Sequence, residues 1–203
     1  MKAASWLPHT ATAYAGASAA LLIVALVFDT ALTRSMALHM LLHIPLILSS
    51  GIFAGAALSV NAGPASWRRA WRLCGKYNEY GVPGLLLAAF VAAYWMIPKS
   101  LDDVLLFPAA AAGKYLGLFI AGVVLFDSLR RANNVIKLFF LGNFSWMSAI
   151  AGLIYQEETT RLCNVYLLSD QELAGRGLVV LALAVPGAWL LSEWARMRRL
   201  MSK

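Results

Sequence analysis

The sequence contains few charged residues, and this scarcity is its most informative feature. Only 13% of the 203 residues are Asp, Glu, Lys or Arg, while 61% are hydrophobic. An ordinary soluble domain carries about a quarter of its residues as charges, so a water-soluble fold could not bury this much apolar surface. Several uncharged runs approach the ~20 residues that cross a bilayer as a helix. The composition therefore predicts an all-α, polytopic membrane protein rather than a soluble enzyme.

Acidic residues are fewer than basic ones, which gives a formal net charge of +7. A nucleic-acid-binding surface would gather basic residues on one face among aromatic or polar side chains. Here they sit in short segments between apolar runs, as the positive-inside rule produces. We therefore expect no nucleic-acid partner. The first apolar run is also too long for the h-region of a signal peptide, and no small-x-small cleavage site follows it.

Six apolar runs predict six transmembrane helices within one domain, residues 1–203. Their expected ranges are Ala11–Leu32, Met36–Val60, Gly81–Pro98, Phe107–Phe126, Val135–Tyr155 and Ala174–Trp194. Short connections predict that sequential helices pack as antiparallel neighbours in a bundle. The patterns Gly51-x-x-x-Gly55 and Gly113-x-x-x-Gly117 predict close helix packing, without indicating whether the partner helix belongs to this chain.

The basic residues outside the runs fall mainly on one side of the predicted membrane, which we expect to be cytoplasmic. They are Lys2, Arg68, Arg69, Arg72, Lys76, Arg130, Arg131, Arg196, Arg198, Arg199 and Lys203. The loops of the opposite side are richer in acids. This topology places both ends of the chain in the cytoplasm of a bacterium and the spans in its inner membrane. Trp67 and Trp71, which alternate with arginines, predict a short amphipathic anchor at the cytoplasmic interface.

The two cysteines lie on opposite sides in this topology. Cys74 falls in a cytoplasmic loop and Cys163 in an extracytoplasmic one, so they cannot form an intrachain disulfide. Cys163 is then a lone thiol in a compartment that tends to oxidise thiols. It is a candidate for metal binding or for an intermolecular bond.

The start of the second predicted span carries the residues best suited to chemistry. At about 100° per residue, Met36, His39, Met40 and His43 share one face of an α-helix, near the outer interface. Imidazole and thioether ligands together suit copper, and thioethers favour the cuprous ion. The alternative is structural: the histidines bond to neighbouring helices, and the methionines fill packing gaps.

Other residues extend or compete with this metal hypothesis. Asp29, at the outer end of the first span, is a candidate acceptor for the second N–H of a ligating histidine. Met96 is a candidate ligand from a neighbouring helix, although packing explains it as well. Haem is not expected, because two histidines one turn apart cannot take opposite axial positions and His9 lies on the other side.

The last predicted span is introduced by a second polar segment. Ser169 and Glu172 have capping-box spacing, which explains both without any function. Gln171 remains unexplained by that pattern.

Two of these segments resemble the CtaG-type assembly factors of copper-containing cytochrome c oxidase. His39-Met40-Leu41-Leu42-His43 is similar to the family's intramembrane His-Met-x-x-His, and Asp170-Gln171-x-x-Ala174-Gly175 is similar to its Asp-Gln-x-x-Gly-Gly entry to a late helix. The resemblance implies a multi-helix membrane protein that helps to install copper in a haem-copper oxidase. It also implies that the paired histidines contact the metal.

Two functions follow as hypotheses. The first is a copper-handling assembly factor that binds an exchangeable ion near the extracytoplasmic face and passes it to an oxidase subunit. The second is an accessory structural subunit of a larger membrane respiratory or copper-enzyme complex; a homo-oligomer is a further open alternative. Catalysis is not expected, because no nucleophile–base pair or phosphate loop occurs. Lys114 and Lys137 are expected to snorkel to opposite interfaces.

Overall fold

A computed structural model describes residues 7–60 and 75–201, and every regular element in these two ranges is a helix. The elements are α1 Leu7–Val27, α2 Asp29–Leu32, α3 Met36–Leu38, η1 His39–His43, α4 Ile44–Val60, η2 Glu79–Gly81, α6 Val82–Trp95, α7 Pro98–Leu106, α8 Pro108–Arg131, α9 Asn134–Glu157 and α10 Leu168–Met201. The all-α prediction is confirmed. The predicted interfacial anchor at Trp67 and Trp71, and Cys74, lie outside the described residues.

Five helical stretches are long and apolar enough to cross a membrane. They are Thr10–Val27, Met36–Val60, Pro108–Arg131, Asn134–Glu157 and Leu168–Trp194. The third predicted span differs, because the chain there bends by 76° between α6 and α7 and counts as a sixth span only if the pair is taken together. With 14 residues, α6 is about 21 Å long, short of the ~30 Å hydrocarbon core.

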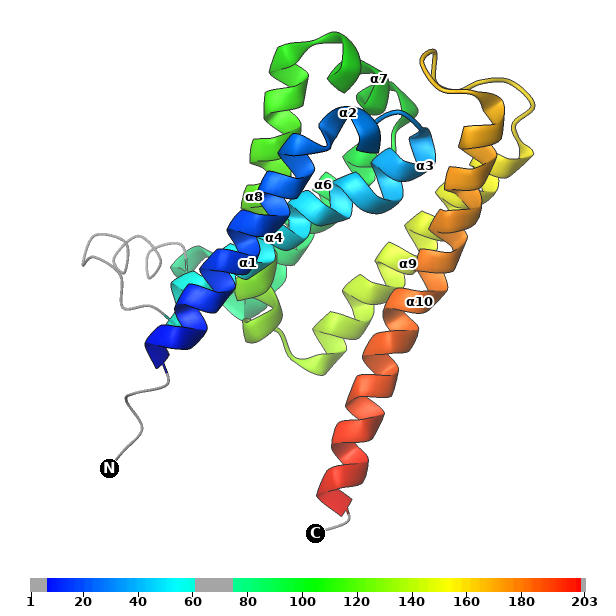
Figure 1. The fold of residues 1–203 in the computed structure, drawn as a ribbon. Coiled ribbons are helices and arrows are strands. Elements are labelled where there is room, and N and C mark those ends of the chain that lie inside the picture. The colour runs from blue at the N-terminus through cyan, green and yellow to red at the C-terminus, as the bar shows by residue number, and fades with distance from the viewer. Residues whose placement is uncertain (1–6, 61–74, 202–203) are drawn as a thin grey trace.

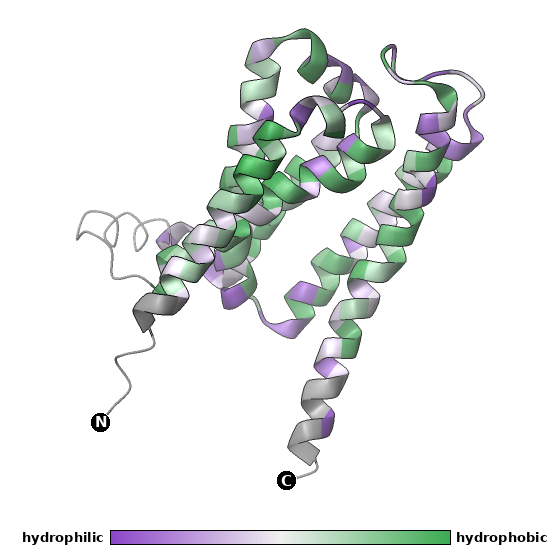
Figure 2. Cartoon of the chain, viewed as in Figure 1, coloured by the Kyte–Doolittle hydropathy of each residue, from purple (hydrophilic) through white to green (hydrophobic). Residues whose placement is uncertain are grey.

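The helices alternate in direction, so the segments that join them collect at the two ends of the bundle (Figure 1). One end holds α2, α3, α7 and the 158–167 segment that joins α9 to α10. The other end holds the start of α1, the turn between α8 and α9, and the end of α10. Hydrophilic residues concentrate at these ends, while apolar residues cover the lengths between them (Figure 2). This distribution fits a bundle whose sides meet lipid.

Glycines allow close packing between α4 and α8. A Cβ atom added to Gly51 would collide with the carbonyl oxygen of Phe119, and one added to Gly122 would collide with that of Leu48. The partner of the Gly51 face therefore belongs to this chain. The two helices run in the same direction (Figure 1), although sequential pairs such as α9 and α10 are antiparallel as predicted.

The hairpin of α9 and α10 joins the other helices near one end. Gly152 and Gly175 let α9 and α10 approach closely, since an added Cβ on either would lie 2.6 Å from the other's carbonyl oxygen. At Gly177 of α10, the side chain of Leu41 from η1 fills the space where a Cβ would stand. The contact with η1 therefore places the start of α10 beside the segment that carries the two histidines.

Candidate functional site

The histidine segment is not the continuous α-helix that its spacing predicts. Ser35 accepts a hydrogen bond from the N–H of Leu38 at 3.3 Å and starts α3, but His39–His43 form a π-helical turn, closed by the Ile44 N–H bonding to the His39 carbonyl. Pro45 supplies the reason. It has no N–H to give to the Leu41 carbonyl, and its ring clashes with that carbonyl in an α-helix. The wider turn relieves both defects, and such turns are frequent at functional sites.

Both imidazoles of this turn point to one lysine. Lys114 Nζ lies 3.2 Å from Nε2 of His39 and 3.2 Å from Nδ1 of His43, and the two imidazole centroids are 5.5 Å apart. All three side chains are fully buried. The expectation that Lys114 snorkels to an interface is wrong, because the histidine nitrogens give its Nζ polar partners inside the bundle.

In each imidazole, the ring nitrogen that does not face Lys114 has a partner of its own. Nδ1 of His39 lies 2.9 Å from the Tyr166 hydroxyl, which donates to the Thr33 carbonyl at 3.0 Å. This hydroxyl therefore accepts from His39. A lysine ammonium only donates, so Nε2 of His39 presents its lone pair to Lys114.

The second imidazole follows the same logic. Nε2 of His43 lies 3.1 Å from the Ala25 carbonyl and 3.1 Å from the Tyr115 hydroxyl. A carbonyl oxygen only accepts, so Nε2 carries the proton and Nδ1 accepts from Lys114. Two imidazole lone pairs thus converge on one cation.

Asp29 supplies the negative charge of the site. Its Oδ1 accepts from the Tyr115 hydroxyl at 2.8 Å and lies 3.5 Å from Nε2 of His43 and 3.6 Å from Lys114 Nζ. The predicted first span breaks at Phe28, so that α2 begins at Asp29 and this carboxylate lies beside His43 and Lys114. With its side chain 41% exposed, Asp29 links the buried cation to the rim of the bundle.

The 158–167 segment delivers Tyr166 to this site and is held by two side chains. Gln171, 1% exposed, accepts from the Leu162 N–H at 2.8 Å and donates to the Tyr155 carbonyl at 3.2 Å. Asp102 of α7 is buried and accepts from the backbone N–H groups of Asn164 and Val165 at 2.7 and 3.3 Å. The role of Gln171 that the capping pattern left open is therefore to fasten this segment.

The sulfur-containing side chains lie in an apolar cluster. Met36, Met40 and Cys163 belong to a buried apolar cluster that also includes Tyr166, and Met96 packs against it. The Cys163 thiol donates to the Pro98 carbonyl at 3.3 Å. Burial raises the pKa of this thiol to about 12, with a further contribution from the negative charge of Asp102. The four residues predicted to share one helical face are thus all buried, and Tyr166 joins the two groups, since it belongs to the apolar cluster and its hydroxyl bonds to His39.

The start of α10 corrects one further prediction. The helix begins at Leu168, so Ser169 lies inside it rather than at its cap, and Glu172 pairs with Arg176 at 3.7 Å. Asp170 lies in the first turn, where a negative charge interacts favourably with the helix dipole.

Sequence reasoning missed Lys114, Tyr115, Tyr166 and Asp102. One available signal was Lys114 itself, because an ionisable residue inside a membrane span is a functional candidate by default. The tyrosines carried no comparable signal. Aromatic residues near the ends of spans are common as interfacial anchors.

Within residues 7–60 and 75–201, no group of three or more His, Cys, Asp or Glu side chains is placed to hold a metal ion. The donors at the site are instead two histidines facing a lysine. No family model matches the chain, and neither the curated proteins nor the solved structures include a match to it.

Proposed function

We propose that this chain is a membrane-embedded assembly factor that holds a cuprous ion between His39 and His43 and passes it to a haem-copper oxidase. The convergence of Nε2 of His39 and Nδ1 of His43 on one buried cation carries the copper part of the proposal. The proposal that the ion is delivered to an oxidase rests on the resemblance of the His39–His43 and Asp170–Gly175 segments to the CtaG-type family.

The donor chemistry supports copper as cargo. Neutral imidazoles suit copper and zinc, but structural zinc sites use four ligands. This site presents two imidazole lone pairs, and a cuprous ion accepts so few neutral donors more readily than a zinc ion does. The hydrogen bonds from His39 to Tyr166 and from His43 to the Ala25 carbonyl fix the tautomer of each imidazole, as second partners do for ligating histidines. Few donors also permit release by ligand exchange.

The location supports delivery outside the cytoplasm. The site lies at the end of the bundle that holds α7 and the 158–167 segment (Figure 1), whereas Lys76, Arg130 and Arg131 lie at the other end. By the positive-inside rule, the histidines then face the periplasmic side of a bacterial inner membrane, and both chain ends face the cytoplasm.

Copper titration of the purified full-length chain tests this function. We expect about one cuprous ion per wild-type chain and none in the His39→Ala/His43→Ala double variant. His9→Ala is the matched control, since His9 lies in the first turn of α1, at the opposite end of the bundle. Equal copper loading of the wild type and the double variant, with both eluting as folded protein, would sink the assignment.

One observation favours the second candidate, an accessory structural subunit. Nothing lies within 4 Å of a Cβ added to Gly113 or Gly117 of α8, so their face of the helix has no partner among the described residues. Small residues on a membrane helix suit close approach of another helix. This candidate predicts co-purification with a larger complex at fixed stoichiometry, with or without copper. Recovery of the chain mainly by itself would count against it.

A further inference from the structure

We infer that Lys114 is an internal competitor for the proposed copper site: its ammonium occupies the point between His39 and His43 in the copper-free protein and must leave before the ion can bind. The inference rests on the proposed function and concerns the regulation of the same site. In physical terms, the same two nitrogen lone pairs bind the Lys114 ammonium and the copper ion in turn.

The contacts leave no room for both cations. His39 and His43 each have one unprotonated ring nitrogen, and both nitrogens point to Lys114 Nζ at 3.2 Å. Their other nitrogens are held by Tyr166 and by the Ala25 carbonyl, so neither ring can flip without losing a buried bond. A metal ion that takes both lone pairs therefore displaces the ammonium.

The displaced ammonium has a nearby destination. Asp29 Oδ1 lies 3.6 Å from Lys114 Nζ, and its side chain is 41% exposed at the rim of the site. The lysine stem is flexible and its ammonium can exchange partners. A short swing toward Asp29 would keep the ammonium paired and separate it from the incoming positive ion.

This arrangement explains how a buried pair of imidazoles stays formed when empty. Without a cation, two acceptor nitrogens would be buried and unsatisfied, which is costly. Lys114 satisfies both and thereby lowers the net gain from copper binding. The site then holds its cargo weakly enough to release it, and the returning ammonium takes the place of the departing ion.

Other roles of Lys114 would change the copper affinity differently. If Lys114 were a third copper ligand through its amine, replacing it would weaken copper binding. If it only filled space, an uncharged side chain of similar length would leave the affinity unchanged. The sign of the change in affinity therefore separates competition from ligation and from packing.

The test is a cuprous-ion competition titration against a chromogenic chelator, with the full chain in lipid nanodiscs. We expect Lys114→Leu, which removes the charge and adds no donor atom for copper, to bind cuprous ion at least about tenfold more tightly than the wild type. Lys114→Ala should bind more tightly as well and serves as a second uncharged variant if the leucine variant does not fold. Lys114→Arg retains the charge and should not gain affinity.

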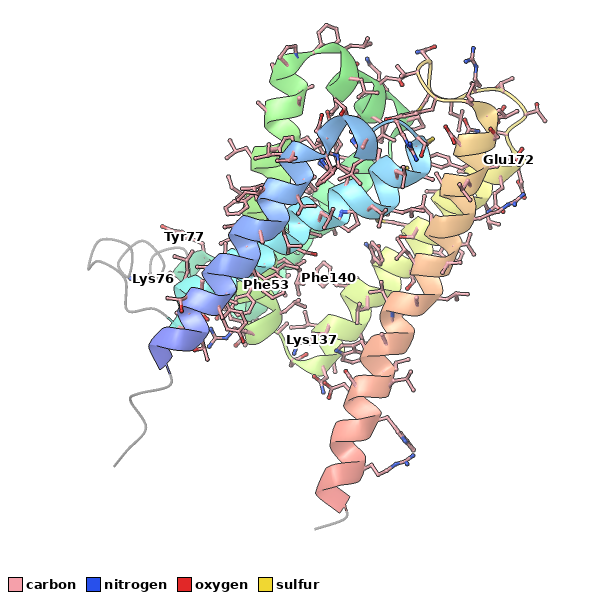
Figure 3. The ribbon with its side chains drawn as sticks, viewed as in Figure 1. Phe53, Lys76, Tyr77, Lys137, Phe140 and Glu172 are labelled. Carbon is pink, nitrogen blue, oxygen red and sulfur yellow. The ribbon has the colours of Figure 1, made fainter. Side chains whose placement is uncertain are left out.

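Lys137→Leu is the matched control, because this lysine lies near the start of α9, far from the site (Figure 3). It should bind as the wild type does. Wild-type or weaker affinity in Lys114→Leu and Lys114→Ala, with copper still lost in His39→Ala/His43→Ala, overturns the competitor role and leaves the copper function standing. Absence of histidine-dependent copper binding from the wild type and from both uncharged variants overturns the function itself.

Discussion

Replacing Gln171 by leucine should release the segment that carries Tyr166 and Cys163, because the Gln171 amide ties the Leu162 backbone of that segment to the end of α9. The amide oxygen accepts from Leu162 N–H and the amide nitrogen donates to the Tyr155 carbonyl. Tyr155 lies in the last turn of α9, where carbonyls have no partner further along the helix. Leucine fills a similar volume but leaves both backbone groups unpaired.

The expected cost follows from these two groups. A buried donor or acceptor left without a partner costs about 1–3 kcal/mol, and the opened segment recovers part of this by reaching water. We therefore expect local opening to become easier by about 2 kcal/mol, a factor of about 30 in the population of the open form.

Alkylation of Cys163 measures this opening, since the thiol is 1% exposed in the closed segment. In a Cys74→Ser background, the maleimide labelling rate of Gln171→Leu should rise by about the same factor of 30, because opening precedes labelling. Gln156→Leu is the matched control, as the Gln156 amide donates to the Gly152 carbonyl of its own helix. Labelling of Gln171→Leu no faster than the control would refute the fastening role.

Three other substitutions or conditions test separate parts of the structure. Gly122→Ala should destabilise the fold by about 2 kcal/mol in detergent unfolding because its Cβ meets the Leu48 carbonyl, whereas Gly113→Ala should not. Pro45→Ala should restore an α-turn and weaken cuprous-ion binding at least about tenfold, with helical content unchanged by circular dichroism. In a Cys74→Ser background, Cys163 should show no ultraviolet absorbance of a thiolate at about pH 10, because burial in the closed segment raises the thiol pKa to about 12.

The membrane helices were predictable because bilayer thickness imposes a length that the sequence displays directly. Five of the six predicted spans contain a helix of sufficient length and apolarity. The third does not, and Pro98 gives the reason. It stands at the first position of α7, where proline is favoured, so the chain starts a new helix there instead of continuing α6.

The geometry of the site was less predictable, because it depends on contacts between residues far apart in the chain. The spacing of His39 and His43 indicated a shared face, but the π-helical turn depends on Pro45. Lys114 is 71 residues from His43, and no local pattern indicates that pairing. Gln171 shows the same difficulty, since its partners belong to α9 and to the segment after it.

The position of Lys114 opposite the histidines follows from the glycine contact between α4 and α8. These helices run in the same direction and are in close contact where Gly51 faces Gly122. His43 precedes Gly51, and Lys114 precedes Gly122, by the same interval of about two helical turns. Parallel helices that share this contact place both side chains at one depth, so the glycines set the register at which Nζ reaches both imidazoles. A change that separates α4 from α8 should therefore disturb the cation site as well as the stability of the fold, whereas alanine at Gly113, which faces open space, should leave both unaltered.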